Sequence, residues 1–230
     1  MTARGVEQFM ALGWSHKHKS MRLDVLKRLL IATNNQGKLV EFRSLLADCG
    51  WLLVAPVELG LALDVEESAD SYELNARLKA QAFADASGLA ALADDSGLEV
   101  DALNGGPGVR SARYGGPGLD ERQRVVLLLD ALKDVPDERR PARFRCVLIL
   151  SLPDGRIWQT EGRCDGTIAR ESRGADGFGY DPVFLLPGSG RTMAELSPHE
   201  KDAISHRARA CAAMLPHLKR LGEDAAYAGA

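Results

Sequence analysis

The sequence has no long apolar segment: no run among its 230 residues approaches the roughly 20 apolar residues that a membrane-spanning helix needs. It also has no recognisable secretory signal, because the first 20 residues contain only a short apolar patch at 9–12 before the basic stretch 16–19. The basic excess typical of general nucleic-acid binders is absent too, since 29 Lys and Arg stand against 32 Asp and Glu. We therefore expect a cytoplasmic protein whose partner is neither a membrane nor a nucleic acid.

Paired cysteines are also missing. The four cysteines are far apart and form no C-x-x-C pair, which argues against a structural zinc site. An even number of cysteines is compatible with disulfides, but a chain of this length does not need disulfide bonds to stabilise its fold. We expect reduced thiols at these positions, which are Cys49, Cys146, Cys164 and Cys211.

Two common nucleotide-binding motifs are absent. The first polar loop lacks the G-x-x-x-x-G-K-[ST] spacing of a P-loop, and the glycine-rich segment 174–179 is not the G-x-G-x-x-G of a dinucleotide fold. Apolar residues make up 45% of the chain and charged residues 27%, as in ordinary globular proteins. We predict one domain over 21–230, with 1–20 as a disordered extension, because a second methionine, Met21, directly precedes the first strand-like region.

Strand and helix patterns alternate along the chain without regular strand–helix–strand units. This mixture predicts an α/β fold built on an elongated mixed β-sheet with flanking helices. The predicted strands are 28–33, 51–55, 89–93, 142–152, 156–163 and 167–170, and the predicted helices are 39–47, 71–86, 119–133 and 198–222.

The most informative stretch is 89–114. Its apolar run 89–93 reads as a buried strand that ends at Asp94 and Asp95, and 96–97 (Ser-Gly) is predicted to turn the chain. Two carboxylates at the end of a strand, with the arginines at 110 and 113 downstream, suggest a metal and a polyanion bound together. The alternative is a pair of solvated acids that simply end the strand.

Three further segments suggest a ligand. The strand–loop–helix at 28–47 directs backbone N–H groups and Lys38 toward an anion, although a plain connection would look the same. In 174–184, glycines flank Phe178, whose ring offers a flat face to a base; the alternative is a turn with core aromatics. The final helix, capped by Ser197, carries several donors in its first turns, which suit an anionic or carbonyl-bearing ligand or else form a surface cluster.

Four ordered motifs together resemble the inosine/xanthosine triphosphate pyrophosphatase family over about residues 28–220. They read IATNNQGK, ADDSGLEVDALNGGPGVRSARY, GFGYDPVF and ELSPHEKDAISHR. The resemblance implies two lobes around a central nucleotide-binding cleft, a homodimer and Mg²⁺ dependence. It also implies hydrolysis of ITP, dITP and XTP to the monophosphate and pyrophosphate, which removes deaminated purine nucleotides from the precursors of DNA and RNA.

The same resemblance implies roles for individual residues. Asp95 matches the proton-accepting and metal-associated aspartate, and Lys38 matches the phosphate lysine. Glu66 and Glu67 match an acidic pair that supplies one further metal ligand, and we favour Glu67. The implied substrate contacts are Thr33, Asn34, Asn35, Gln36, Gly37, Lys38, Ser96, Phe178, Gly179, Tyr180, Asp181, Lys201, His206 and Arg207.

One departure from the family pattern occurs at Asn34, where the family usually has glycine. Because Asn tolerates positive φ better than most residues, we expect the loop to keep its shape. Donors near His206 and Arg207 fit a 6-keto purine and oppose the 6-amino group of adenine, which rejects ATP but does not reject GTP. The alternatives are a pyrophosphatase for other modified or pyrimidine nucleotides and a non-catalytic nucleotide-binding protein.

Overall fold

The computed structural model describes residues 27–224, and the predicted extension at 1–20 lies outside this range. Its centre is a six-stranded sheet in the order β2-β1-β3-β4-β5-β6. Strands β2, β1 and β3 are parallel, whereas β3, β4, β5 and β6 pair antiparallel. The strands are β1 (Arg28–Ile31), β2 (Leu52–Val54), β3 (Ala90–Val100), β4 (Pro141–Ser151), β5 (Ile157–Ile168) and β6 (Phe184–Leu185). This confirms the predicted mixed sheet.

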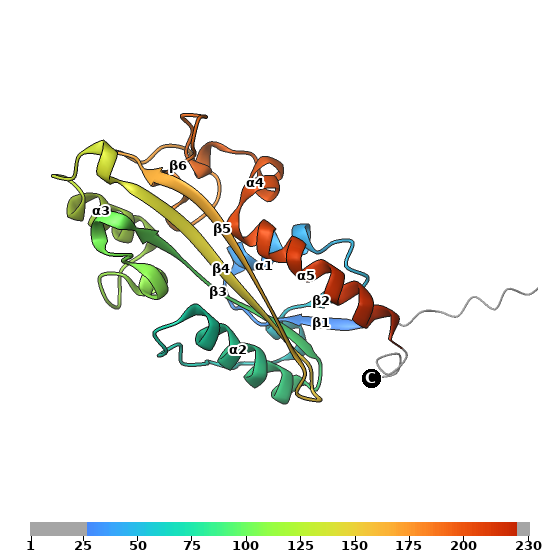
Figure 1. The fold of residues 1–230 in the computed structure, drawn as a ribbon. Coiled ribbons are helices and arrows are strands. Elements are labelled where there is room, and N and C mark those ends of the chain that lie inside the picture. Colours follow the sequence, from blue (N-terminus) through green and yellow to red (C-terminus); the bar gives the residue numbers. More distant parts are fainter. Residues whose placement is uncertain (1–26, 225–230) are drawn as a thin grey trace, which may run out of the picture.

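Helices cover both faces of the sheet at its β1–β2 end (Figure 1). Helices α1 (Gln36–Leu45) and α5 (His206–Glu223) share one core with the inward residues of β1, β3 and β4, such as Leu92 and Leu148. Helix α2 (Tyr72–Ser87) packs against the alternate residues, such as Ala93 and Val147, on the opposite face. Side chains in a strand point to alternate faces, so neighbouring residues of β3 enter different cores.

The long strands β3, β4 and β5 continue past these helices to a third core. There, helix α3 (Glu121–Ala131) packs Val125 and Leu128 against Leu98, Phe144 and other residues of the strands. In Figure 1 these strands run as a curved ribbon from the α2 end to the α3 end. Separate cores at the two ends of one sheet match the predicted two-lobed shape.

The predicted turn at Ser96 and Gly97 is wrong, because β3 runs on to Val100 and pairs with β4 throughout. Gly97 is needed for a different reason. A Cβ at this position would overlap the carbonyl oxygen of Gly108, so the missing side chain lets the 3-10 helix at Gly108–Arg113 lie against β3. Consequently, Asp94 and Asp95 lie inside the strand rather than at its end.

The predicted final helix is instead two helices. Helix α4 (Pro198–Ile204) starts from the Ser197 cap as expected, but Ser205 adopts an extended backbone and its Oγ caps α5. Helix α5 then runs one residue beyond Gly222, to Glu223. The predicted strand at 167–170 is the end of β5, which extends to Ile168. The break at Ser205 places His206 and Arg207 in the first turn of α5.

Two predictions from residue patterns can be assessed directly. All four cysteines are buried and free, in agreement with reduced thiols. Within the described range 27–224, no helix combines the length and apolarity required to cross a bilayer.

Candidate functional site

The loop after β1 is fixed by its own side chains. Asn35 Oδ1 accepts the N–H of Lys38 at 3.0 Å and so caps α1, while Thr33 Oγ1 accepts the N–H of Asn35 at 3.2 Å. The tolerance of asparagine for positive φ is not needed at Asn34. Asn104 is the sole described non-glycine residue with positive φ, so the backbone of Asn34 has negative φ. The Asn34 side chain instead donates to the Leu63 carbonyl at 3.4 Å.

Asp94 is an anchor for cations. It is 1% exposed, and its carboxylate forms ion pairs with Lys38 and Arg207, each at 3.0 Å. Ser96 Oγ also donates to Asp94 at 3.0 Å. Burial alone would raise the pKa of Asp94, but Lys38 and Arg207 outweigh it and hold that pKa well below its ordinary value. Asp94 is therefore a permanently charged, fully engaged carboxylate.

Asp95 faces the other side of the sheet and has different neighbours. Its Oδ2 accepts from Asn75 Nδ2 at 2.9 Å, and its Oδ1 accepts the N–H of Ser96 at 2.9 Å. Burial raises the pKa of Asp95, although Lys79 and Asn75 oppose the shift. A carboxylate that is buried but not ion-paired within hydrogen-bonding distance retains lone pairs for a metal or a proton.

Asp95 lines a cavity of about 260 Å³, which we call the acidic cavity. The phosphate-loop residues Thr33, Asn34 and Asn35 and the side chains of Lys38, Glu67 and Lys79 also line it. Glu67 forms an ion pair with Lys79 at 2.6 Å, and Lys79 in turn donates to the Asp94 carbonyl at 2.5 Å. Gln36 and Gly37 do not line this cavity; they form the first turn of α1.

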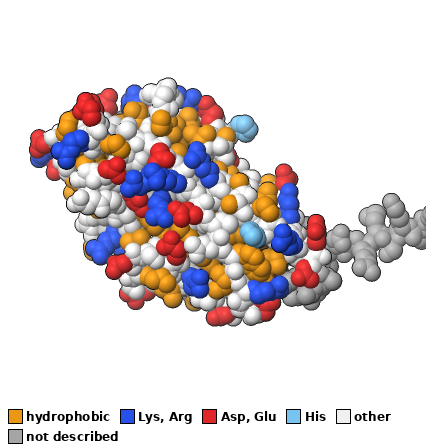
Figure 2. Space-filling view, viewed as in Figure 1, with side chains coloured by type: hydrophobic (Ala, Val, Ile, Leu, Met, Phe, Trp, Pro, Cys, Tyr) orange, Lys and Arg blue, Asp and Glu red, His pale blue; other side chains and the backbone are white. Residues whose placement is uncertain are grey.

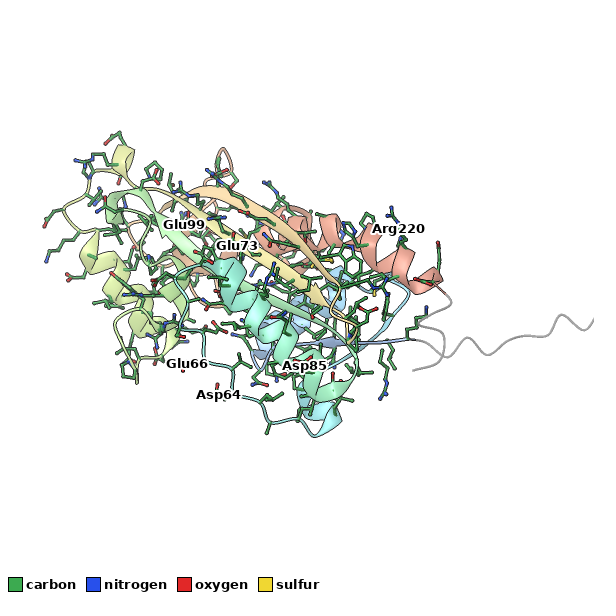
Figure 3. The ribbon with its side chains drawn as sticks, turned by 60° about the horizontal axis from the view of Figure 1, so that its bottom comes forward. Asp64, Glu66, Glu73, Asp85, Glu99 and Arg220 are labelled. Atoms are coloured by element: carbon green, nitrogen blue, oxygen red, sulfur yellow. The ribbon has the colours of Figure 1, made fainter. Side chains whose placement is uncertain are left out.

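The two predicted acidic residues are not equivalent. Glu67 lines the acidic cavity, whereas Glu66 is exposed and lies outside it. Figure 3 shows Glu66 and Asp64 on the extended segment that precedes α2. Three carboxylates line the acidic cavity: Asp95, Glu67 and the exposed Asp64. Residues 27–224 contain no group of three or more His, Cys, Asp or Glu side chains arranged to hold a metal.

A second cavity, which we call the aromatic pocket, lies next to the first. It has a volume of about 200 Å³ and is lined by Phe144, Phe178, Gly179, Tyr180 and His206. Asn35, Ser96 and Ala112 line both cavities and so form their shared boundary. An apolar pocket adjoins a charged one, as a ligand with a flat ring and an anionic tail requires.

His206 is a buried polar residue of the aromatic pocket, which Glu121 and Arg124 also line. Its ring stacks on Phe144 with ring centres 4.8 Å apart, and its Nδ1 is buried without a hydrogen-bond partner among the described residues. Burial, together with the cations Arg207 and Lys201, lowers the pKa of His206 well below its ordinary value. A neutral, buried imidazole with an unpaired nitrogen is suited to a ligand, because an unpaired buried polar atom otherwise costs stability.

The glycine-rich segment folds over the pocket as a tight loop. The Phe178 ring packs so closely on Gly37 that a Cβ at Gly37 would lie 2.8 Å from it. Asp181 Oδ2 accepts the N–H of Phe178 at 2.9 Å, and Tyr180 Oη donates to the Ser111 carbonyl at 3.0 Å. The segment thus links the aromatic pocket to the loop after β1.

Lys201 and Arg207 lie beside Phe178 but line neither cavity. Lys201 Nζ is 4.8 Å from the centre of the Phe178 ring, and Arg207 Cζ is 5.7 Å from it. Both cations share the carboxylate of Glu41 on α1, and Lys201 also pairs with Asp181 at 2.5 Å. Burial would lower the pKa of Lys201, but Asp181 and Glu41 raise it.

Sequence reasoning missed several residues of this arrangement, among them Phe144, Glu41, Asn75 and Lys79. A partial signal existed for two of them, because Asn75 and Lys79 are four residues apart and so share one face of α2. From the sequence alone, this face of α2 would be assigned to the hydrophobic core. In the structure it faces Asp95. Glu41 gave no such signal, since its partners lie more than 150 residues away.

Known proteins resemble this chain along most of its length. The Ham1 family model matches residues 29–217. The chain is 47% identical over 194 residues to the dITP/XTP pyrophosphatase of Desulforamulus reducens, covering 84% of this chain and 96% of that protein. It is 44% identical over 186 residues to the dITP/XTP pyrophosphatase of Bacillus subtilis, covering 81% and 94%.

Solved structures agree with the sequence comparison. The Ham1 protein of Staphylococcus aureus superimposes with a TM-score of 0.75 at 40% identity, covering 85% of this chain and all of that one. The nucleoside-triphosphatase, or dITP/XTP pyrophosphatase, of Mycobacterium abscessus gives 0.67 at 47% identity, covering 83% and 99%. Similarity of this extent in both sequence and fold shows that the chain belongs to the Ham1 family.

Proposed function

We propose that this protein hydrolyses deaminated purine nucleoside triphosphates, namely ITP, dITP and XTP, to the monophosphate and pyrophosphate. The observation that carries the proposal is the pairing of an acidic, lysine-lined cavity with an aromatic pocket lined by His206, whose buried Nδ1 has no partner among the described residues. The aromatic pocket suits the base and the acidic cavity the triphosphate. The relatives named dITP/XTP pyrophosphatase support this reading.

The donor set of the acidic cavity fits Mg²⁺. Magnesium is usually bound through one or two carboxylates together with substrate phosphates and water, not by a complete cage of protein ligands. Asp95 and Glu67 supply two such carboxylates. When bound, Mg²⁺ would neutralise charge on the phosphate oxygens. We propose Asp95 and Glu67 as its ligands and leave Glu66 out of the set.

The remaining residues of the acidic cavity orient the triphosphate. Lys38 and the backbone N–H groups at the start of α1 form a positive end that suits phosphate oxygens. Asp95 carries the proton-accepting role, since its carboxylate lies in the cavity and can take the proton of the attacking water. In-line placement of the phosphate chain by the loop 33–38 then provides the orientation that this reaction needs.

Base selection follows from the charges beside Phe178. Lys201 and Arg207 carry hydrogen-bond donors and no acceptor atoms, and burial together with these two cations keeps His206 neutral, so that His206 offers one N–H. A 6-keto purine presents an acceptor to such donors, whereas adenine presents an amino group to them. We therefore propose that this group of donors rejects ATP.

We further propose that the protein acts as a cytoplasmic homodimer and binds no nucleic acid. The face shown in Figure 2 supports the last point, because Lys and Arg side chains are interspersed with Asp and Glu rather than gathered into one positive field. Sedimentation velocity would test the dimer, since a single species at the monomer mass contradicts it.

One assay separates the candidate functions: pyrophosphate release from ITP, XTP, dITP, GTP, ATP and dUTP in the presence of Mg²⁺. We expect turnover of ITP, dITP and XTP at a kcat/KM at least about 100-fold above that for ATP, the ratio that unpaired buried donors produce. Preference for dUTP or GTP would contradict the substrate assignment. Nucleotide binding without pyrophosphate release would instead identify a non-catalytic binding protein.

A further inference from the structure

Asn75 connects two parts of the site that are distant in sequence. It lies in the first turn of α2 and is fully buried. Its Oδ1 accepts the N–H of Ala69 at 3.1 Å, and its Nδ2 donates to the Ala69 carbonyl at 3.2 Å. The same Nδ2 donates to Asp95 Oδ2 at 2.9 Å. The Asn75 amide therefore forms hydrogen bonds both with the backbone of Ala69, two residues after Glu67, and with the carboxylate of Asp95.

The segment that carries Glu67 is held by its side chains: Leu63 and Val65 pack against the core beside α2, and Glu67 pairs with Lys79. Residues 61–71 contain no helix or strand. Apart from those of Asn75, the side-chain hydrogen bonds to its backbone are exposed: Arg113 Nη2 donates to the Glu67 carbonyl at 2.7 Å, and Asn34 donates to the Leu63 carbonyl at 3.4 Å. Exposed hydrogen bonds compete with water and contribute little to stability, whereas the hydrogen bonds of the Asn75 side chain are shielded from solvent.

We propose that Asn75 is a positioning residue that fixes the Glu67 segment and the Asp95 carboxylate relative to each other, and so builds the magnesium site. This inference rests on the proposed function, because it assumes that both carboxylates bind one metal ion. An amide is suited to the task because it accepts from the backbone and donates to the carboxylate at once. An aspartate could accept from Ala69 but would face Asp95 with a second negative charge.

The test compares Asn75→Leu and Asn75→Asp with a control, Ser71→Ala. Asn75→Leu keeps the branched shape of the side chain and removes the amide. Ser71→Ala removes the N-cap of the same helix, which costs about 1 kcal/mol without touching Asp95. Three quantities are measured: Mn²⁺ binding without nucleotide by electron paramagnetic resonance, hydrogen exchange of residues 61–71, and kcat and KM for ITP at saturating Mg²⁺.

For Asn75→Leu we expect Mn²⁺ affinity to fall about 10–100-fold, as it does when a partner that orients a metal ligand is lost. Exchange in 61–71 should become faster, and kcat should fall more than KM rises. Asn75→Asp should also lose at least tenfold in kcat/KM, and Ser71→Ala should change both Mn²⁺ affinity and kcat/KM by less than about twofold.

Three outcomes would overturn the inference. They are wild-type Mn²⁺ affinity in Asn75→Leu, full activity in Asn75→Asp, or equal losses in Ser71→Ala. Mn²⁺ binding and hydrogen exchange do not depend on turnover. If the wild-type protein releases no pyrophosphate from any nucleotide, the proposed function fails while these two measurements still decide the role of Asn75.

Discussion

At the scale of single residues, Asp94 and Asp95 show how one position along a strand changes the chemistry of a side chain. They are adjacent, but β3 continues through both, so their carboxylates point to opposite faces of the sheet. Asp94 meets Lys38 and Arg207, whereas Asp95 meets Asn75 and the acidic cavity. Two carboxylates that look equivalent in sequence therefore have separate tasks.

Asparagine substitutions should separate these tasks. We expect Asp95→Asn to lower kcat by about 10²–10⁴-fold, the usual contribution of a general base, with a melting temperature near that of the wild type. Asp94→Asn should lower stability by about 3–5 kcal/mol, because Arg207 would become a buried cation with a lost partner. Pyrophosphate release and thermal unfolding measure the two effects. Near-normal turnover in Asp95→Asn would remove Asp95 from the mechanism.

Glu66 and Glu67 provide a second matched pair. Glu67→Gln should raise the Mg²⁺ concentration for half-maximal activity by at least about tenfold, because a ligand in the acidic cavity is lost. Glu66→Gln should leave that concentration unchanged within about twofold, since Glu66 is exposed. A magnesium titration of both variants measures this. The reverse order of the two effects would exchange their assignments.

At the scale of elements, the site depends on how closely α5 approaches β5. Gly162 makes this approach possible, because a Cβ there would overlap the His206 carbonyl and the backbone N of Ala210. Figure 1 shows α5 lying along β5, so a shift of this helix would move His206 and Arg207 together. The Ser205 cap, which divides the predicted single helix in two, sets the start of α5 at the same place.

Gly162→Ala should therefore affect stability and substrate binding at once. We expect a loss of about 1–3 kcal/mol from overpacking, and a rise in KM for ITP of at least about tenfold because His206 is displaced from the aromatic pocket. Denaturant unfolding and steady-state kinetics measure these changes. The control is Glu161→Ala, whose exposed ion pair with Arg145 contributes at most about 1 kcal/mol. An unchanged KM in Gly162→Ala would show that α5 tolerates the shift.

At the scale of the whole molecule, stability should depend on the protonation of His206. In the folded protein its pKa lies well below 6.5, so folding excludes a proton that the unfolded chain binds. The stabilisation by neutral His206 is present above pH 6.5 and is lost as the pH falls below that value. Between pH 7.5 and 5.5 the loss should be about 1.4 kcal/mol, the equivalent of one pKa unit.

His206→Gln should abolish most of this pH dependence, because glutamine does not titrate. The free energy of unfolding of both proteins, measured by urea at pH 7.5 and 5.5, checks the expectation. If the variant loses as much stability on acidification as the wild type, the titrating group lies elsewhere.

The sequence by itself determined the family, the mixed α/β fold and the segments that form the site. Local rules sufficed for the fold class, since turn residues, caps such as Ser197 and hydrophobic periods act between residues close in the chain. The family came from the resemblance of four ordered motifs. The motifs at 33–38, 95–96, 178–181 and 201–207 predicted the ligand segments through the same resemblance.

Only the tertiary structure decided which side chains work together. The sequence predicted a strand end at Asp94 and Asp95, whereas pairing with β4 carries β3 on to Val100. The partners of Asp94 and Asp95 come from α1, α2 and α5, up to 113 residues away. A buried carboxylate takes its charge state from the cations and donors that folding brings to it, and no local pattern encodes those partners.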